Sequence, residues 1–406
     1  MIWRISWRNI WRNKVRSLTV MMAIAIGLTG GIFLTGLMNG MSAQQANDAI
    51  SLEISHVQIH HRLFVDNLSA QFLIEDVAGK LEVIRKDERV RAFCSRTKAQ
   101  AIASTATTGA GIIISGIVPE MEKKVTTIYN KIVEGSYFEK ENKAASIVIG
   151  QKLAHKLKAG IGNKIVVTLQ SLNGEMSYAL FRVGGIYKTS NTRFDEMNVF
   201  VKSDDLNPVL GIEPSQTNEI AMLTASHEAA IPVAASLKSS FDKLSVENWR
   251  ELRPLLVVIS AMTDQFGFWL IVIILLALIF GIINTMLMVI LERKHELGML
   301  MAIGMNKTRV FKMILLETTM LSLSGGLVGL FISMTLMGIF GNIGINFAAW
   351  SKGLEAMGYS AFVYPFVSAR FYMIITILVI ITAIIASLWP TRKALKLNPA
   401  EAVRSE

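Results

Sequence analysis

The chain has 406 residues, of which 52% are hydrophobic and only 18% are charged. This composition is too apolar for a purely soluble protein, and the length allows two or three domains. The basic residues behind the formal net charge of +10 cluster beside apolar runs, without interleaved aromatic side chains in a polar domain, which argues against a nucleic-acid partner. A single cysteine, Cys94, excludes an intrachain disulfide.

Residues 1–17 predict an amphipathic helix that lies in the headgroup layer of a membrane. An aromatic stripe repeats every fourth residue and a cationic stripe follows one position later: Trp3, Trp7 and Trp11, then Arg4, Arg8 and Arg12. Residues 18–40 form the first predicted transmembrane helix, because about 21 mostly apolar residues are enough to cross the hydrocarbon layer. A cleaved secretory signal is the alternative, but the apolar run is too long and no small-x-small cleavage site follows it.

Residues 41–266 differ in kind, with mixed charge, frequent turn residues and no run that could span a bilayer. Alternating apolar patterns predict strands, and helical patterns interrupt them. We therefore expect an extracytoplasmic α+β domain in two lobes, inserted between the first and second spans. The expected strands cover 54–60, 111–118, 164–170, 179–186 and 199–202, and the expected helices cover 75–86, 150–157 and 227–243.

Three further transmembrane helices are predicted at 267–291, 310–340 and 371–389, the last ended by Pro390. Positive residues gather in residues 1–17, 292–309 and the tail 390–406, whereas the loop 341–370 offers only Lys352 and Arg370. By the positive-inside rule, both termini and residues 292–309 face the cytoplasm, and the large domain faces outside.

Residues 292–309 form a charged island between two very apolar segments. Leu297, Leu300, Met301 and Gly304 follow the spacing of one helical face, and Gly304 is expected to stop that helix. Asn306 can cap the helix that follows. A short helix held between two spans transmits any push on it to both of them.

The run Glu292-Arg293-x-x-Glu296-Leu297-Gly298-x-x-x-Ala302-x-Gly304, followed by Glu317, resembles the coupling-helix signature of the MacB/FtsX-type permeases of ABC transporters. The tail segments 390–394 and 398–404 are similar to the C-terminus of that family. The resemblance implies an α-helical membrane protein with four transmembrane helices and a large inserted extracytoplasmic α+β domain, in the bacterial inner membrane. It also implies an ABC ATPase dimer and a second permease copy or paralogue as partners, with ATP and Mg²⁺ bound by the ATPase, so that this chain binds no cofactor.

The sequence predicts no catalytic residues. Gly79-Lys80 is followed by Leu81, and Gly304 to Thr308 lacks an adjacent Gly-Lys pair, so neither stretch is a Walker A loop. Hydrolase motifs of the Gly-x-Ser-x-Gly and His-Glu-x-x-His types are also missing. The triplet His56, His60 and His61 suggests a metal site, but no acidic or cysteine partner lies nearby in sequence, and the polar face of a strand explains it better. We predict no metal.

Two features of the third span leave alternatives open. Glu317 lies inside the apolar run, where an unpaired carboxylate is costly. Either it reaches the membrane interface or pairs with Lys312 or Arg309, or it supports the groove that receives the ATPase, as the family resemblance implies. The Gly325-x-x-x-Gly329 pair packs against another span of this chain or against a partner subunit.

The resemblance implies a permease that moves its external domain when a partner hydrolyses ATP. Release of lipoproteins from the inner membrane is the leading expectation, with a lipoprotein or a periplasmic adaptor as a further partner. The alternatives are MacB-like efflux of amphipathic compounds or peptides and FtsX-like signalling to a cell-wall hydrolase. Residues 171–176 predict a tight hairpin in place of the proline-containing hook of chaperone-binding lipoprotein permeases, which argues against direct chaperone capture.

Overall fold

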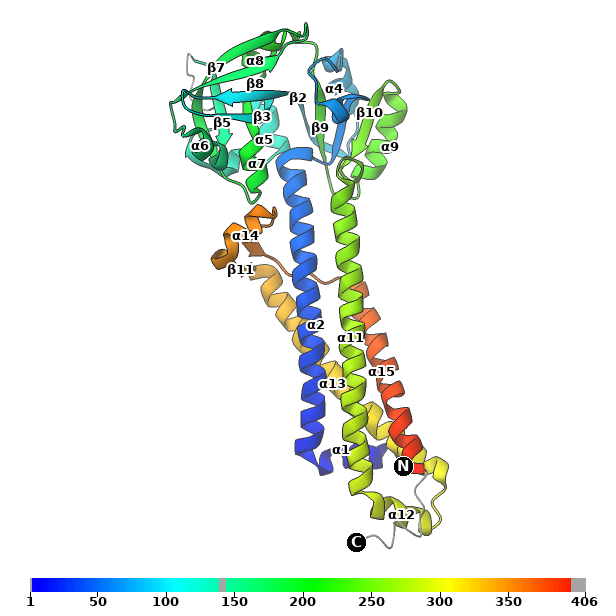
Figure 1. Ribbon diagram of the computed structural model, residues 1–406. Coiled ribbons are helices and arrows are strands. Elements are labelled where there is room, and N and C mark those ends of the chain that lie inside the picture. The colour runs from blue at the N-terminus through cyan, green and yellow to red at the C-terminus, as the bar shows by residue number, and fades with distance from the viewer. Residues whose placement is uncertain (1, 139–143, 396–406) are drawn as a thin grey trace. The chain divides into compact units, whose positions relative to one another are not determined.

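The computed structural model describes residues 2–138 and 144–395, and its contacts divide the chain into two compact units. The helical unit consists of Met1–Ser42, Ile259–Asn346 and Phe362–Glu406. The α/β unit consists of Ala43–Val258 and Phe347–Ala361, and therefore includes part of the loop between the third and fourth spans as well as the large insertion (Figure 1).

Within the described residues, four helices are long and apolar enough to cross a membrane, as the sequence predicted. They are α2 (Lys14–Ala49), α11 (Pro254–Glu292), α13 (Lys307–Ile343) and α15 (Ala369–Leu395), and they are accompanied by the shorter α1 (Ile2–Arg12) and α12 (Lys294–Ala302). Both α2 and α11 run well beyond the predicted spans, so each continues as a helix out of the apolar segment.

The interfacial helix ends earlier than residue 17. The helical conformation is interrupted at Asn13, between α1 and α2. The Ser17 hydroxyl donates to the Ile10 carbonyl at 2.6 Å. That bond satisfies one of the carbonyls left unpaired at the end of α1, which stabilises the break.

The prediction that Pro390 ends the fourth span is wrong, because α15 continues through it to Leu395. Proline removes one backbone donor from the helix. In the same stretch the Thr391 hydroxyl donates to the Ser387 carbonyl and the Ser387 hydroxyl to the Ile384 carbonyl, so that side chains supply hydrogen bonds near the interruption.

The described residues of the α/β unit form a ten-stranded sheet in the order β10-β1-β9-β2-β3-β8-β5-β7-β4, with β6 paired to β2 and β7. The strands are β1 (Val57–His61), β2 (Val90–Ser104), β3 (Gly109–Ile117), β4 (Ile132–Gly135), β5 (Ser146–Gly150), β6 (Lys164–Gln170), β7 (Met176–Tyr187), β8 (Asn198–Lys202), β9 (Glu219–Thr224) and β10 (Leu244–Asn248). The helices are α3 (Phe64–Asn67), α4 (Val77–Arg85), α5 (Pro119–Val125), α6 (Gln151–Leu157), α7 (Thr192–Met197), α8 (Ser203–Leu210), α9 (Ala230–Ser240), α10 (Trp249–Leu252) and α14 (Ser351–Ala356). A π-helical turn, Ile50–Ile54, follows α2, and two 3₁₀ turns, Ile128–Lys131 and Ala348–Trp350, also belong to the α/β unit. The strand pair β11 (Ile345–Asn346) and β12 (Phe362–Val363) belongs to the helical unit.

The predicted two lobes are present, each with its own buried core. One core lies between α4, α9 and the strands β1, β9 and β10, and the other lies around β3, β5, β6, β7 and β8 with α6 and α8. The long strand β2, which the sequence analysis missed, joins them: its residues 90–96 pair with β9 and its residues 96–104 pair with β3.

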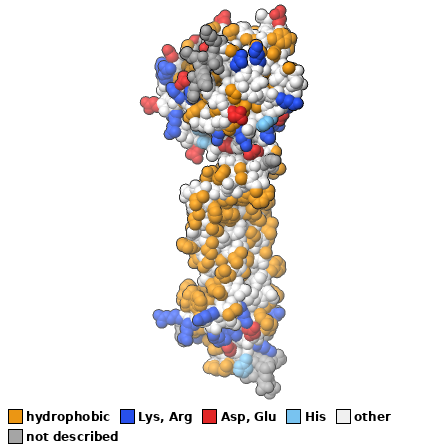
Figure 2. Space-filling model, turned by 90° about the vertical axis from the view of Figure 1, so that its left-hand side faces the viewer, with side chains coloured by type: hydrophobic (Ala, Val, Ile, Leu, Met, Phe, Trp, Pro, Cys, Tyr) orange, Lys and Arg blue, Asp and Glu red, His pale blue; other side chains and the backbone are white. Residues whose placement is uncertain are grey.

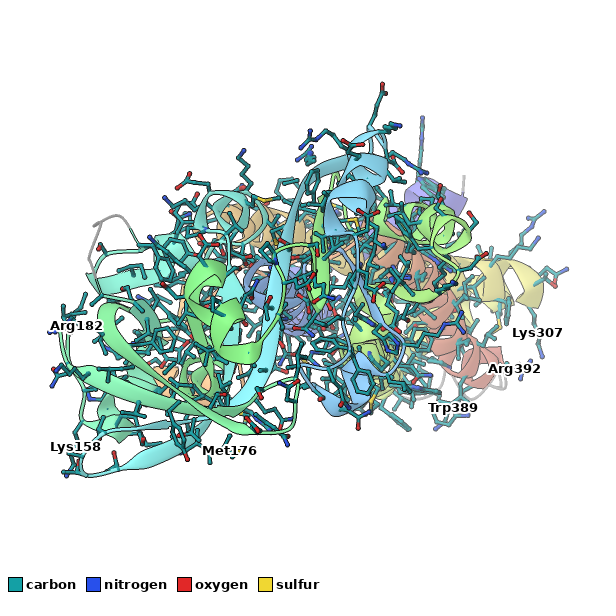
Figure 3. All side chains as sticks on the ribbon, turned by 90° about the horizontal axis from the view of Figure 1, so that it is seen from above. Lys158, Met176, Arg182, Lys307, Trp389 and Arg392 are labelled. Atoms are coloured by element: carbon teal, nitrogen blue, oxygen red, sulfur yellow. The ribbon has the colours of Figure 1, made fainter. Side chains whose placement is uncertain are left out.

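The β6–β7 connection is the tight hairpin that the sequence predicted. Ser171 and Glu175 close it with a backbone bond of 2.9 Å, and Gly174 adopts a φ of +83° that favours glycine. Figure 3 shows Met176 and Arg182 of β7, together with Lys158, at one edge of this lobe.

Candidate coupling site

The helix α12 is the predicted coupling helix, and the signals at its ends are confirmed. Gly304 has a φ of +97°, and the Met305 amide donates to the Leu300 carbonyl, which closes the helix after Ala302. The Asn306 side chain accepts from the Thr308 amide at 3.0 Å and caps α13. The connection between α11 and α13 therefore consists of the short helix α12 followed by a single tight turn.

Arg293, between α11 and α12, is the centre of an ion-pair network. Its Nη1 donates to both carboxylate oxygens of Glu317 in α13, at 3.1 and 3.2 Å, and its Nε donates to Glu296 of α12 at 3.0 Å. The other oxygen of Glu296 accepts from Arg12 of α1 at 2.6 Å. One guanidinium thus holds α12 to α13, and Glu296 extends the contact to α1. The predicted partners of Glu317, Lys312 and Arg309, are wrong for this conformation.

Further polar contacts fasten α1 and the start of α2 to the same site. Arg16 forms an ion pair with Glu292, the last residue of α11. Ser6 donates to the Met313 carbonyl of α13 at 3.1 Å, and Asn9 donates to Glu317 at 3.4 Å. The contacts of Ser6 and Asn9 were not predictable, because a polar residue on the inner face of an amphipathic helix carries no sequence signal of its partner.

The pKa of Glu296 is lowered, first by the hydrogen bond from Arg12 and then by Arg293. Glu296 therefore stays ionised, and both of its ion pairs persist across the physiological pH range. Glu296 therefore connects α12 to Arg12 of α1 and to Arg293 at the α11–α12 junction.

Leu297 and Gly298 are buried within the helical unit, so they do not form the outer surface of α12 in this conformation. The exposed residues of the helix and its turn are different ones: His295, Met299, Ala302, Ile303 and Gly304. Of the predicted docking residues, Glu292, Ala302 and Gly304 are exposed, Arg293 and Glu296 are partly exposed, and Glu317 is buried.

Basic side chains gather at this end of the helical unit. Figure 2 shows a band of Lys and Arg next to the apolar surface of the helices, and Figure 3 places Lys307 of α13 near Arg392 and Trp389 of α15. Trp3, Trp7 and Trp11 are exposed on α1, as are Arg4, Arg8 and Arg12. The tail segment 398–404, which carries part of the family resemblance, lies outside the described residues.

The Gly325-x-x-x-Gly329 pair packs against α2 of the same chain. A Cβ atom built at Gly325 would lie 2.9 Å from the Met21 carbonyl oxygen, and one at Gly329 would lie 3.0 Å from Ala25 Cα. The Thr29 hydroxyl also donates to the Gly329 carbonyl at 3.1 Å. Of the two alternatives that the sequence left open, the structure shows the contact within one chain.

The three histidines singled out by the sequence, His56, His60 and His61, do not converge on one site. His56 is buried, and its Nδ1 accepts from the Thr224 amide at 3.0 Å. His60 lies 3.7 Å from Glu247, and His61 stacks on Phe72. Across residues 2–138 and 144–395, no group of three or more His, Cys, Asp or Glu side chains is arranged to hold a metal ion.

Two family models match the chain. A MacB-like periplasmic core domain covers residues 17–240, more than half of the chain, and an FtsX-like permease C-terminal domain covers residues 268–399. The lipoprotein-releasing system transmembrane protein LolC of Neisseria meningitidis is 21% identical over 94% of this chain and 92% of its own length. The macrolide export ATP-binding/permease protein MacB of Sodalis glossinidius is 32% identical over 31% of this chain and 17% of its own length.

Among solved structures, the periplasmic region of MacB from Actinobacillus actinomycetemcomitans aligns over 52% of this chain and 97% of that one, with a TM-score of 0.36 and 12% identity. The first family model covers most of the inserted domain, and the second begins in the second span and includes the coupling region. The chain belongs to the MacB/FtsX-type permeases, the membrane components of ABC transporters.

Proposed function

We propose that this chain couples ATP hydrolysis by a separate ATPase dimer to movement of its α/β unit, with α12 as the element on which the ATPase acts. The observation that carries the proposal is the double contact of Arg293, to Glu296 of α12 and to Glu317 of α13. A force on α12 passes through this guanidinium into α13, and through the continuous chain into α11. The exposed side of α12 with Met299 and Ile303 offers the ATPase an apolar contact, rimmed by charge.

The proposed topology places the N-terminus, α12 and the tail in the cytoplasm of a bacterial cell and the α/β unit outside the inner membrane. The unequal distribution of Lys and Arg between the two sides supports it. In this arrangement α2 and α11, which continue beyond the apolar segment as unbroken helices, carry the movement out of the membrane.

We propose lipoproteins of the inner membrane as the cargo. The similarity to LolC over nearly the whole chain supports this choice. Extraction of acyl chains costs about 0.8 kcal/mol for each buried CH₂ group, so a lipoprotein with several chains does not leave the bilayer spontaneously and needs a driven stroke.

Efflux of amphipathic compounds or peptides is the second candidate, favoured by the higher identity to MacB over a short stretch. Depletion of this chain followed by membrane fractionation separates the two functions. Lipoproteins retained in the inner membrane, with unchanged drug sensitivity, support release. Normal lipoprotein sorting with raised sensitivity to macrolides or peptides contradicts release and supports efflux.

A second permease copy or paralogue is proposed to pack against α11. This helix exposes a stripe of large apolar residues at alternating spacings of four and three, which is the repeat of helices that pair side by side: Met262, Phe266, Trp269, Ile273, Leu276 and Phe280. Cysteine at Ile273 should form a cross-link between two copies, or to the paralogue, in native membranes. Cysteine at the buried Ile271 is the matched control, and cross-links from both positions or from neither contradict this interface.

Docking is tested through Ile303, which is 80% exposed at the end of α12. Ile303→Asp should leave membrane insertion intact and weaken ATPase binding, because it places a charge in an apolar contact. The control is Ile343→Asp, the same substitution at an exposed isoleucine at the C-terminal end of α13, far along the helix from α12. Normal ATPase binding by Ile303→Asp contradicts the assignment of this surface.

A further inference from the structure

Two apolar grooves adjoin on the surface of the helical unit, between α2 and α13. The first, of about 390 Å³, follows α2 from Met22 to Phe33 and α13 from Ile332 to Phe340. The second, of about 280 Å³, is lined by Trp7 and Trp11 of α1 and by neighbouring residues of α2 and α13. Both are lined by Met22, so they adjoin at this residue and together extend from α1 along the two spans. We name the pair the α2–α13 groove.

The glycine contacts of α13 create this groove. Gly325 and Gly329 bring the backbone of α13 against α2. The larger side chains on either side of this crossing therefore form the sides of the groove. The two polar residues in the lining already use their hydroxyl groups on backbone carbonyls: Thr29 donates to Gly329, and Ser324 donates to Met320 at 2.8 Å. The groove therefore presents hydrocarbon and aromatic surface to its occupant.

Next to the end of the groove at α1, the same helix carries arginines that are not part of the apolar lining and are incompletely paired. Arg12 and Arg16 form ion pairs with glutamates, whereas Arg4 and Arg8 are exposed and make no ion pair within the described residues. On α1 these two arginines follow directly after Trp3 and Trp7 in sequence, and Trp7 lines the groove. Figure 2 shows the band of Lys and Arg beside the apolar surface.

We infer that the α2–α13 groove binds an anionic glycerophospholipid from the membrane leaflet in which α1 lies. An acyl chain fills the apolar groove, the tryptophans lie at the depth of the ester groups, and the phosphate is attracted by Arg4 and Arg8. A second copy of the chain is the poorer occupant, because in the same membrane it would bring its own unpaired arginines to the same level. This inference is separate from the proposed cargo and concerns a lipid that stays with the permease.

Native mass spectrometry of the purified full-length chain tests this site. After incubation with phosphatidylglycerol or with phosphatidylcholine of identical acyl chains, we expect the wild type to retain phosphatidylglycerol selectively. Equal retention of both lipids means that the groove holds non-selective boundary lipid only, and overturns the inference.

The groove is blocked by Gly30→Phe, because a Cβ built at Gly30 in the lining meets nothing within 4 Å and the ring projects into the groove without disturbing the helix contact. The control is Gly281→Phe in α11, where a Cβ is equally unobstructed. We expect Gly30→Phe to abolish the preference for phosphatidylglycerol and Gly281→Phe to keep it. A changed oligomeric state of Gly30→Phe with unchanged lipid retention would assign the groove to a second copy and overturn the lipid site.

The charged end is tested with the double variant Arg4→Gln/Arg8→Gln, against Lys307→Gln/Arg309→Gln, which removes two exposed cations from the start of α13. Loss of two interfacial arginines should reduce phosphatidylglycerol retention by about tenfold or more. If both double variants lower phosphatidylglycerol retention equally, the attraction is general electrostatics and there is no groove site. The same conclusion follows if the arginine variant lowers this retention while Gly30→Phe leaves it unchanged.

Discussion

Arg293 donates to both carboxylate oxygens of Glu317, a residue 24 positions away in the chain, and the two side chains are largely shielded from solvent. The pair joins the end of α11 to the interior of α13. Because Arg293 also contacts Glu296, a single guanidinium links α12 and α13 at the end of α11.

Arg293→Ala is therefore expected to be strongly destabilising. Removal of one partner from a buried ion pair leaves an uncompensated charge, which costs about 3–5 kcal/mol. Glu317→Gln should be milder, because Arg293 keeps its contact with Glu296. Thermal unfolding of the purified chain measures both. Lys294→Ala, which removes a neighbouring cation without an ion pair in the described part of the chain, is the control, and an Arg293→Ala midpoint equal to that of the control contradicts the role of the pair.

The contact between α2 and α13 is expected to tolerate no side chain at Gly329. Leucine there would force the backbones apart, since even a Cβ lies 3.0 Å from Ala25 Cα, and overpacking of this kind costs about 1–3 kcal/mol or more. Gly338→Leu is the matched control on the same helix, because its Cβ meets nothing within 4 Å. A lower unfolding temperature for Gly329→Leu alone is the expected result. Equal midpoints would mean that the two helices do not pack as described.

Features with a local physical cause were predictable from the sequence. The four apolar helices follow from residue type, the end of α12 from the conformational freedom of Gly304, and the start of α13 from the capping oxygen of Asn306. The partner of Glu317 was not predictable, because Lys312 and Arg309 are near in sequence and only the packing of α12 brings Arg293 closer. The inward orientation of Leu297 was not predictable either, because an apolar helix face has the same sequence pattern whether it packs inside the chain or against a partner.

The lobe that contains His56 is expected to lose stability in mild acid. Burial lowers the pKa of His56 from 6.5 to about 4, so the unfolded lobe binds more protons between these values and stability rises with pH across that window. Acidification from pH 7 to pH 5 should therefore cost this lobe about 2 kcal/mol. Asp195, in the other lobe, acts in the opposite sense, because burial raises its pKa from 3.8 to about 6.

A local measurement is needed to separate these opposing effects. Hydrogen exchange of the β1 and β9 amides in the full-length protein, corrected for the intrinsic effect of pH, reports on the His56 lobe. The difference between pH 7 and pH 5 should shrink in His56→Gln, where only the neighbouring His227, whose pKa burial also lowers, still contributes. It should persist in full in His155→Gln, a change at an exposed histidine of α6. Protection that is the same at both pH values in the wild type contradicts a buried neutral imidazole.

The proposed topology can be tested by labelling single introduced cysteines, because the native Cys94 is expected not to react in the folded protein. It is fully buried on β2, and burial raises the pKa of its thiol, so little reactive thiolate forms. With a membrane-impermeant maleimide added outside the inner membrane, Tyr178→Cys on the exposed face of β7 should react at once. Lys307→Cys at the start of α13 should react only after the membrane is permeabilised, and Cys94 only after denaturation. Labelling of Lys307→Cys before Tyr178→Cys would reverse the orientation, and with it the proposal that α12 meets the ATPase in the cytoplasm.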